Sequence, residues 1–482
     1  MTQEDLITPF RVGSVFDTRS LGDILREIQE VYLQDQRPWV IGFSGGKDST
    51  CTLQLVWDAI QGLPKNKRTK AVHVISSDTL VETPVIVNLI DGSLERIRHL
   101  ATEKGLPFTA TKVQPAIGET FWVNLIGRGY PAPYRNFRWC TDRMKIQPAD
   151  RFILEQVSKS GEVVVVLGVR RQESMTRAQL MSLSRIKGSL FSRHRTLPNT
   201  FVYTPIAEFS TEDVWEYLLQ NPNPWGNNNR DLLALYKSAN AGECPLVVDD
   251  TTPSCGNSRF GCWVCTVVSK DHAMEALVDG GERWMLPLLE FRNLLASTQD
   301  PTRKAEYRDA KRRNGQMKLK SDGSPGFARG PYRFEFRKDL LRRLLDAQKT
   351  VQASGPGKNM ELIRHSELEE IRRIWRRECG DWDDSVPKIY MEVFGRELDW
   401  LPEDLGAFTA DDAELLRTAC EKNGVPPLLV ARLLDVEREV QGMAKRASVY
   451  VNLSKILREE WRTESSVLEE LTAEARDTGG RT

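Results

Sequence analysis

The chain has 482 residues, of which 40% are hydrophobic and 28% are charged. This length allows two or three domains, and the composition is that of a soluble globular protein. The 67 basic and 67 acidic residues cancel, which excludes a protein that is basic throughout but leaves room for local basic patches. No apolar run approaches the roughly 18 residues of a membrane span, and the N-terminus lacks the pattern of a secretory signal. We therefore expect a cytoplasmic protein without a membrane partner.

The first 36 residues contain apolar side chains at helical spacing. These are Leu21, Ile24, Leu25, Ile28, Val31 and Tyr32. The spacing predicts an amphipathic helix that covers an edge of the domain that follows.

The stretch 39–49 carries the main functional signal. Residues 39–43 form an apolar run bounded by turn residues, which predicts a buried strand. Gly45 and Gly46 then allow a tight turn with exposed backbone N–H groups, and a helix is expected to follow. Such a loop forms an anion cradle, because its amides and the helix dipole point to one place, and Lys47 adds a cation. The alternative is a plain turn without a ligand.

The residues of this loop resemble the signature of the PP-loop ATP pyrophosphatases. The matching residues are Ser44, Gly45, Gly46, Lys47, Asp48 and Ser49. The resemblance implies that they bind the pyrophosphate of ATP together with Mg²⁺, and that Lys47 and Asp48 take part in catalysis. The loop lacks the longer spacing of the Walker type.

A second buried strand is predicted over 70–78, a helix over 82–104 and a third strand over 107–113. Asp78 ends the second strand, and ligands of open α/β sheets gather at the carboxyl ends of the strands. We therefore expect Asp78 beside the anion cradle, and a helix cap is the alternative. His73 is expected to be a packing residue.

Two further segments contain residues suited to chemistry. Cys140 has basic neighbours, which would favour a thiolate: Arg135, Arg138, Arg143 and Lys145. A strongly apolar strand is predicted over 162–168, and arginines suited to phosphate follow it at Arg170, Arg171 and Arg177. For these arginines the alternative is a cluster of surface ion pairs.

These segments resemble motifs of the phosphoadenylyl-sulfate (PAPS) reductase branch of the PP-loop superfamily. The matching residues are Asp78-Thr79 with Glu82-Thr83, Trp139-Cys140-Thr141 with Lys145, and Gly168, Arg170, Glu173, Ser174 and Arg177. The resemblance implies that Asp78 and Glu173 help to bind the nucleotide and that the three arginines stabilise developing charge. A strand at 203 and a capped helix with Ser210 and Asp213 extend the likeness to about residue 220.

Four cysteines lie close together after residue 240. Cys255, Cys262 and Cys265 have the spacing of metal ligands, and eight cysteines in a cytosolic chain indicate metal or redox chemistry. A fourth thiolate comes from Cys140 or Cys244, and the likeness to the reductases implies Cys140. We predict a [4Fe–4S] cluster on these residues, and the spacing leaves Zn²⁺ open as the alternative.

The C-terminal region, 276–482, shows helical patterns and local basic runs. Residues 303–320 contain eight basic and two acidic residues, and arginines also cluster in 333–343 and 372–377. Such excesses suit the phosphate backbone of DNA through counterion release. A solvated helix face is the alternative.

Strands that alternate with helices predict a doubly wound parallel sheet of the α/β class. The resemblance specifies a PP-loop (adenine nucleotide alpha hydrolase-like) fold with a cysteine-rich Fe–S insert and a mainly α-helical C-terminal region. The expected parts are a helical lead-in (1–36), the PP-loop domain (37–220), the Fe–S segment (221–275) and the helical region (276–482).

The combination of these features resembles the DndC family of sulfurtransferases in bacterial DNA phosphorothioation. That resemblance implies hydrolysis of ATP to AMP and pyrophosphate, a [4Fe–4S] cluster, DNA as the substrate, and a cysteine desulfurase and other Dnd components as partners. The alternatives are a PAPS or adenylyl-sulfate reductase, an RNA thiolase, and a non-enzymatic, metal-stapled DNA-binding subunit.

Overall fold

The computed structural model describes residues 13–173, 179, 183, 186–239, 261–321, 326–400, 408–439 and 447–470. The chain forms two compact units: unit 1 is Met1–Pro115 with Arg138–Gly281, and unit 2 is Ala116–Phe137 with Glu282–Thr482. The sequence prediction placed 116–137 inside a continuous domain, 37–220. The two compact units divide the chain differently at this segment.

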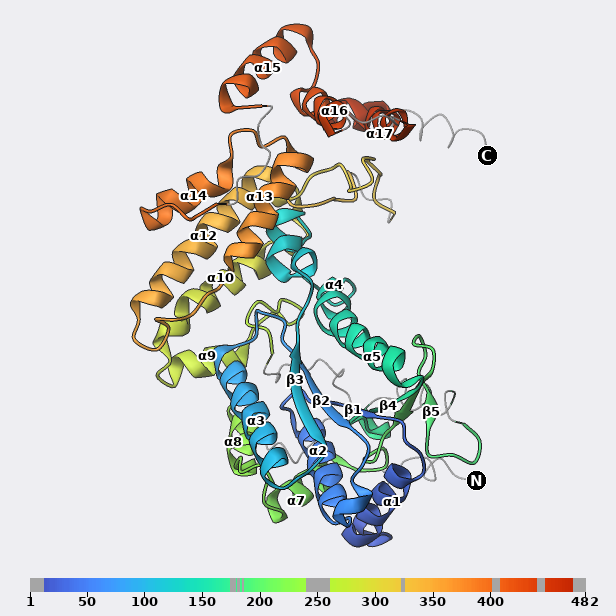
Figure 1. Ribbon diagram of the computed structural model, residues 1–482. Helices are drawn as coiled ribbons and strands as arrows, with labels where there is room; N and C mark the ends of the chain where they lie inside the picture. Colours follow the sequence, from blue (N-terminus) through green and yellow to red (C-terminus); the bar gives the residue numbers. More distant parts are fainter. Residues whose placement is uncertain are drawn as a thin grey trace, which may run out of the picture. The chain divides into compact units, whose positions relative to one another are not determined.

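Unit 1 is built around a six-stranded sheet (Figure 1). Its strands are β1 (Trp39–Gly42), β2 (Val72–Ser77), β3 (Phe108–Val113), β4 (Val163–Val166), β5 (Ser192–Arg193) and β6 (Thr200–Tyr203). The order is β3-β2-β1-β4-β6-β5, and every neighbouring pair is parallel except β5 and β6. The predicted α/β class with a mostly parallel sheet is confirmed. The antiparallel edge strand β5 was not predicted, since two residues leave no periodic signal.

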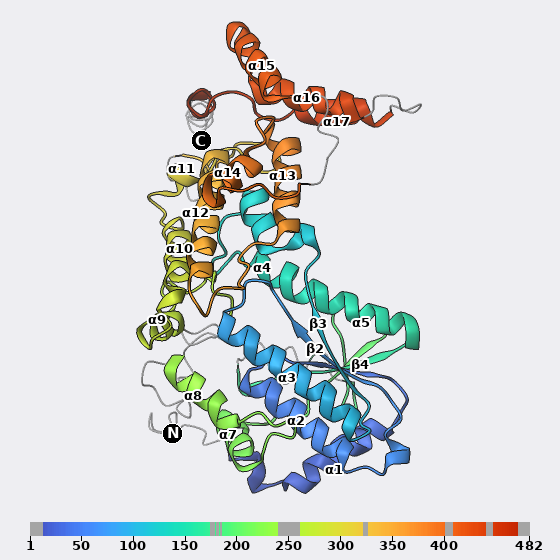
Figure 2. The ribbon, with the colours of Figure 1, turned by 60° about the vertical axis from the view of Figure 1, so that its left-hand side comes forward.

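The two faces of the sheet are covered by different helices, because successive side chains of a strand point to opposite faces. Trp39 and Ile41 pack with α1 (Leu21–Leu33), α2 (Lys47–Gln61), α3 (Pro84–Glu103) and α7 (Thr211–Gln220). Val40 and Val165 pack with Ile153 of α5 (Gln147–Ser160) on the other face. Figures 1 and 2 show α5 on the side of the sheet opposite α2 and α3.

The strand order reverses between β1 and β4. The chain moves outward from β1 through β2 to β3, and then returns to pair β4 with the other side of β1. Ligands of open α/β sheets bind at such a switch point, beyond the carboxyl ends of the strands. A ligand site of unit 1 is therefore expected at the loops that follow β1 and β4.

Unit 1 contains several shorter helical elements. They are η2 (Val15–Asp17), η3 (Lys65–Lys67), α4 (Trp139–Thr141), η6 (Asp142–Ile146), η7 (Arg171–Glu173), α8 (Asn229–Ala239) and α9 (His272–Asp279). The η6 element is a π-helical turn that joins α4 to α5. Such insertions occur often at functional sites, and this one directly follows Cys140.

Unit 2 is helical in its described part, as predicted. Its helices are η4 (Ile117–Glu119), the π-helix η5 (Val123–Gly127), η8 (Arg283–Met285), α10 (Leu286–Ser297), α11 (Lys304–Tyr307), α12 (Phe334–Ala353), α13 (His365–Cys379), α14 (Ser385–Phe394), α15 (Ala410–Asn423), α16 (Pro427–Glu439) and α17 (Ala447–Leu457). Two hydrogen bonds join the segment 116–137 to residues far along the chain. The Trp122 indole donates to the Leu362 carbonyl, and the Trp375 indole donates to the Ile126 carbonyl. None of the described helices has the length and hydropathy of a membrane span.

Candidate functional site

The loop after β1 is held in shape by its own side chains. Gly45 has a φ of 72°, a conformation that glycine adopts without steric cost. The Ser49 hydroxyl accepts a hydrogen bond from the Ser44 amide at 3.2 Å and donates one to the Gly46 carbonyl at 3.0 Å. Ser44 and Ser49 therefore close the turn, so that in this structure their hydroxyls act on the loop itself.

The remaining amides of the loop are candidate donors to an anion. The backbone N–H groups of Gly45 and Gly46 have no hydrogen-bond partner among the described residues. The Lys47 amide, the first of α2, donates to the Tyr236 phenol oxygen at 3.3 Å. A helix N-terminus with such donors is suited to a phosphate group. The predicted strand, loop and helix are thus present at the switch point, and one amide of the loop is held by Tyr236; anion binding by this loop stays a prediction.

Asp48 joins two cations at this loop. Its Oδ1 lies 2.7 Å from Nε of Arg170, and its Oδ2 lies 2.8 Å from Nζ of Lys47. Arg170 is only 4% exposed, so that loss of its carboxylate partner would leave a charge buried, at a cost of about 3–5 kcal/mol. The carboxylate therefore positions both predicted catalytic cations beside the cradle. The sequence predicted all three residues for the site, and the structure brings them together.

The loop after β4 approaches the start of α2 very closely. A Cβ atom added at Gly168 would lie 2.6 Å from the carbonyl oxygen of Asp48, a distance that no packing adjustment of a side chain could relieve. Glycine is thus required here for Arg170 to reach Asp48. This explains in physical terms why a glycine stands two residues before the arginine.

Other residues predicted to bind the nucleotide contact residues outside the loop after β1. Nε of Arg171 lies 3.1 Å from Oε1 of Glu208, and Glu173 ends η7. Arg177 lies outside the described residues. Asp78 accepts hydrogen bonds from the Leu80 amide and from Gln114, both at 2.9 Å, and lies 3.2 Å from Lys112. Asp78 therefore shapes the turn after β2, and α3 begins instead after Thr83.

A second cluster forms where Cys262 pairs with the segment before α3. The Trp263 amide donates to the Val81 carbonyl at 2.9 Å, and the Thr83 amide donates to the Gly261 carbonyl at 3.0 Å. This pairing places the Cys262 sulfur 3.2 Å from the Thr79 hydroxyl. Motif residues that the sequence linked to the nucleotide are thus found beside a cysteine.

Glu82 and Lys145 complete the charged surroundings of Cys262. Lys145 Nζ lies 3.6 Å from Oε1 of Glu82, and Glu82 accepts a hydrogen bond from the Thr79 hydroxyl at 3.0 Å. Burial raises the pKa of the Cys262 thiol, Glu82 raises it further, and Lys145 opposes the rise. The Cys262 sulfur in turn raises the pKa of Lys145. The lysine therefore remains a cation beside the sulfur.

The expected thiolate at Cys140 is corrected by the structure. Burial raises the pKa of the Cys140 thiol, and the neighbouring Cys265 raises it further. Lys145 lowers it, but its effect is smaller than that of desolvation. The run of basic residues in the sequence did not reveal that Cys140 is half-buried.

Three of the four predicted cluster ligands lie among the described residues. Cys140, Cys262 and Cys265 interact electrostatically with one another or with Lys145, whereas Cys255 and Cys244 lie outside the described residues. Within the parts of the chain that the structure describes, no three Cys, His, Asp or Glu side chains are arranged to hold a metal ion. The described residues alone therefore do not make a complete site, and the [4Fe–4S] ligand set stays a prediction.

Tyr236 is the site residue that sequence reasoning missed. It lies on α8, and its ring packs edge-on against Trp215 at 5.3 Å between centroids. Its spacing from Leu232 and Leu233 is that of an ordinary apolar helix face. The contact with Lys47 joins residues 189 positions apart, and no local pattern signals it.

Part of the chain is similar to known proteins. Residues 38–268 match the phosphoadenosine phosphosulfate reductase domain. This part of the chain is therefore similar to that domain. An uncharacterized protein of Methanocaldococcus jannaschii is 28% identical over 243 residues, which are 49% of this chain and 38% of that protein. The chain thus spans well under half of the relative's length.

Two solved structures resemble the chain at low identity. PAPS reductase from Candida auris in its phosphate complex is 16% identical, with a TM-score of 0.28, over 46% of this chain and 94% of the reductase. The U34-tRNA thiolase NcsA from Methanococcus maripaludis, solved with its [4Fe–4S] cluster, is 12% identical, with a TM-score of 0.28, over 57% of this chain and 80% of the thiolase.

Proposed function

We propose that the chain is an ATP-dependent sulfurtransferase of the DndC type, which replaces a non-bridging oxygen of a DNA backbone phosphate by sulfur. The proposal that the chain uses ATP is supported mainly by the amide cradle at the switch point, where Asp48 holds Lys47 and Arg170 beside the loop. The match of residues 38–268 to the PAPS reductase domain supports nucleotide and sulfur chemistry. The proposal that DNA is the substrate rests on the motif resemblance and on the basic runs of the C-terminal region.

In the proposed first step, ATP places its β- and γ-phosphates on the Gly45 and Gly46 amides. A non-bridging oxygen of the DNA phosphate attacks the α-phosphorus, the bond to the β-phosphate oxygen breaks, and pyrophosphate leaves. Lys47 and Arg170 stabilise the charge that develops on the phosphates, and they are already positioned, so that little reorganisation is needed. Mg²⁺ supplies further charge neutralisation when it is bound with the nucleotide.

In the proposed second step, sulfur at the oxidation level of sulfide attacks the adenylylated DNA phosphorus. The phosphorus–sulfur bond forms, and AMP leaves with the former non-bridging oxygen. A cysteine desulfurase would provide the sulfur as a persulfide, and a thiol must supply two electrons to release it as sulfide. Cys140, Cys255, Cys262 and Cys265 would hold the predicted [4Fe–4S] cluster.

A PAPS or adenylyl-sulfate reductase is the second candidate, and the family match favours it. Reduction of the sulfate group by this route needs a mobile thiol that attacks sulfur. Among the described cysteines, Cys420 on α15 is 5% exposed, and this burial does not suit a mobile nucleophile. We place sulfur transfer first because of the motif resemblance to the DndC family.

The test is an anaerobic reaction with ATP, Mg²⁺, duplex DNA, cysteine, a cysteine desulfurase and the other Dnd components. We expect phosphorothioate-linked dinucleotides in the nuclease digest by mass spectrometry, and their loss in Lys47→Ala. Lys65→Ala, which removes an exposed lysine of unit 1, is the matched control. Sulfite released from labelled PAPS, with no sulfur found in DNA, would instead establish the reductase.

A further inference from the structure

The basic runs of the C-terminal half differ in how their cations are paired. Ion pairs occupy much of 333–343 and 372–377: Lys338 with Glu335, Arg342 with Glu392, Arg343 with Asp339, Arg372 with Asp384 and Arg373 with Glu370. In 303–320, ion pairs join Arg303 to Glu306 and Lys311 to Glu459. Lys304 and Arg308 make no ion pair with any described residue. Among the described residues, no carboxylate thus pairs with these two cations of the run 303–320.

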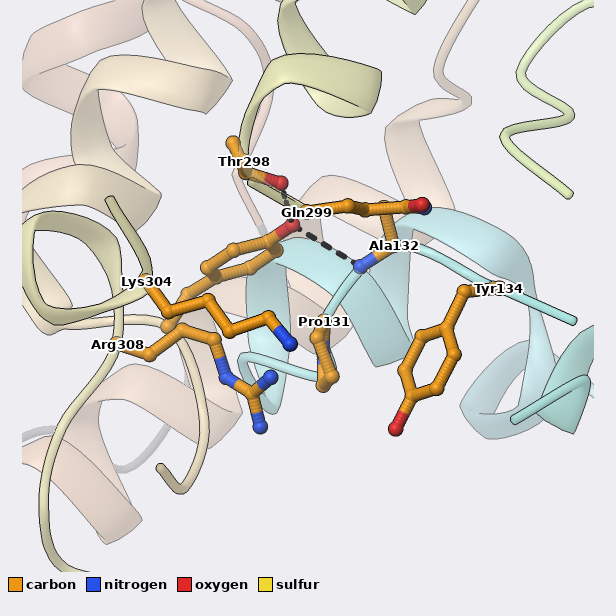
Figure 3. A pocket seen from close by; sticks show the side chains of 8 residues that line it. Pro131, Ala132, Tyr134, Thr298, Gln299, Lys304 and Arg308 are labelled. Carbon is orange, nitrogen blue, oxygen red and sulfur yellow. Dashed lines mark hydrogen bonds between the residues drawn. The ribbon is translucent and has the colours of Figure 1, made fainter. Parts of the chain in front are cut away.

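These two cations line one cavity of unit 2, which has a volume of about 120 Å³ (Figure 3). Tyr134, Gln299 and Tyr332 line it as well, and its described lining contains no carboxylate. Figure 3 shows the Lys304 ammonium and the Arg308 guanidinium on one side of Pro131 and the Tyr134 ring on the other. Pockets for drug-sized ligands are about 300–1,000 Å³, so this cavity suits a single small anionic group.

Arg308 is fixed in a geometry that leaves donors available. Its Nε donates to the Gly330 carbonyl and its Nη2 to the Arg329 carbonyl, both at 2.7 Å. The N–H groups of Nη1 have no acceptor among the described residues. Burial lowers the pKa of Arg308, because the guanidinium loses hydration without gaining a carboxylate. An anion in the cavity would compensate for this loss.

Other residues of the cavity lining are joined by hydrogen bonds. The buried Tyr332 hydroxyl accepts a hydrogen bond from the Ala132 amide at 3.0 Å and lies 2.5 Å from the Thr298 hydroxyl. Gln299 donates through Nε2 to the Pro133 carbonyl at 2.9 Å. These bonds hold α10 and the segment 131–134 together, so that the cavity exists before any ligand enters.

Aromatic side chains extend from the cavity along the same surface. The Tyr134 ring, 38% exposed, lies 5.7 Å from that of Phe137, and Phe137 stacks on Tyr130 at 6.3 Å. The Arg313 guanidinium lies 4.7 Å from the Tyr130 centroid. Cations interleaved with aromatic rings are typical of surfaces that follow a nucleic-acid strand.

We propose that the Lys304–Arg308 cavity binds a phosphodiester group of the nucleic-acid substrate, which is DNA if the proposed function holds. Lys304 and the Nη1 group of Arg308 contact the phosphate oxygens, and Tyr134 contacts the adjoining nucleotide. This assigns the substrate contact to 303–320 rather than to the paired cations of 333–343 and 372–377. The inference rests on the proposed function only for the choice of DNA over RNA.

The test measures binding of a labelled DNA duplex to the full chain by fluorescence anisotropy over a range of salt concentrations. Lys304→Gln should weaken binding about tenfold and should reduce the slope of log K against log salt by about one. Lys358→Gln removes the same charge from an exposed position of unit 2 and is the matched control. Arg308→Gln and Arg396→Gln form a second pair.

Lys304→Gln is the decisive variant, since Lys304 makes no ion pair with a described residue that its loss would break. Equal affinity and salt slope for Lys304→Gln and Lys358→Gln would overturn the proposal. Tighter binding of RNA, lost in the same variant, would support the phosphate cavity and overturn DNA as its source. The proposed function fails independently of this test if DNA binds through the cavity but the complete reaction adds no sulfur to it.

Discussion

If the loop binds the nucleotide as proposed, the Tyr236 phenol competes with it for the Lys47 amide. Tyr236→Phe removes the oxygen that accepts from the Lys47 amide at 3.3 Å and keeps the ring that packs against Trp215. A neutral hydrogen bond contributes about 0.5–1.5 kcal/mol, and a phosphate oxygen must replace this one. The variant should therefore bind a non-hydrolysable ATP analogue about twofold to tenfold more tightly, as measured by calorimetry at constant Mg²⁺.

Tyr32→Phe is the control for this measurement. It removes a hydroxyl that donates to the Lys70 carbonyl at 2.8 Å, in the same unit but without a contact to the loop, and it should leave the affinity unchanged. Weaker binding of the analogue by Tyr236→Phe would show that the phenol contributes to the bound state. That result would refute the competition between phenol and phosphate.

Three further predictions concern stability and geometry. Burial raises the pKa of Asp58 to about 6, so the folded state loses stability as pH rises from about 4 to 6. The free energy of unfolding of Asp58→Asn, measured in urea, should exceed that of wild type by up to about 3 kcal/mol at pH 7.5 and by nothing near pH 4. An equal gain at both pH values would contradict this. Gly168→Ala should destabilise the fold by about 1–3 kcal/mol and weaken binding of the ATP analogue, because its Cβ would meet the Asp48 carbonyl. Gly92→Ala, which has open space around it, should leave both the stability and the affinity unchanged. Ser210→Ala should cost about 1 kcal/mol in thermal unfolding, because the hydroxyl caps α7; an unchanged midpoint would refute the role of the cap.

The core of unit 1 was predictable because its signals are local. The apolar runs at 39–43 and 162–168 became the neighbouring strands β1 and β4, and the glycine loop lies at the switch point that this order creates. Ser210 and Asp213 form the predicted capping box. Each of these features depends on residues within a few positions of one another, so that composition and spacing were sufficient.

The features that escaped prediction depend on distant partners. The segment 116–137 belongs to unit 2, where Trp122 reaches Leu362 across 240 positions. The paired and unpaired cations of the basic runs have the same residue types, so that only the structure separates Lys304 from Arg372. Tyr236 was missed for the same reason, because its helix shows an ordinary apolar pattern while its hydroxyl contacts the distant Lys47 amide.

The measurement that tests the central claim most directly is identification of the products that the purified chain forms from ATP. If the Ser44–Ser49 loop holds the β- and γ-phosphates for attack at the α-phosphorus, ³¹P NMR will show AMP and pyrophosphate in equal amounts. Their formation will be lost in Lys47→Ala and retained in Lys65→Ala. ADP and inorganic phosphate as the products, or AMP formation that survives Lys47→Ala, would contradict the account.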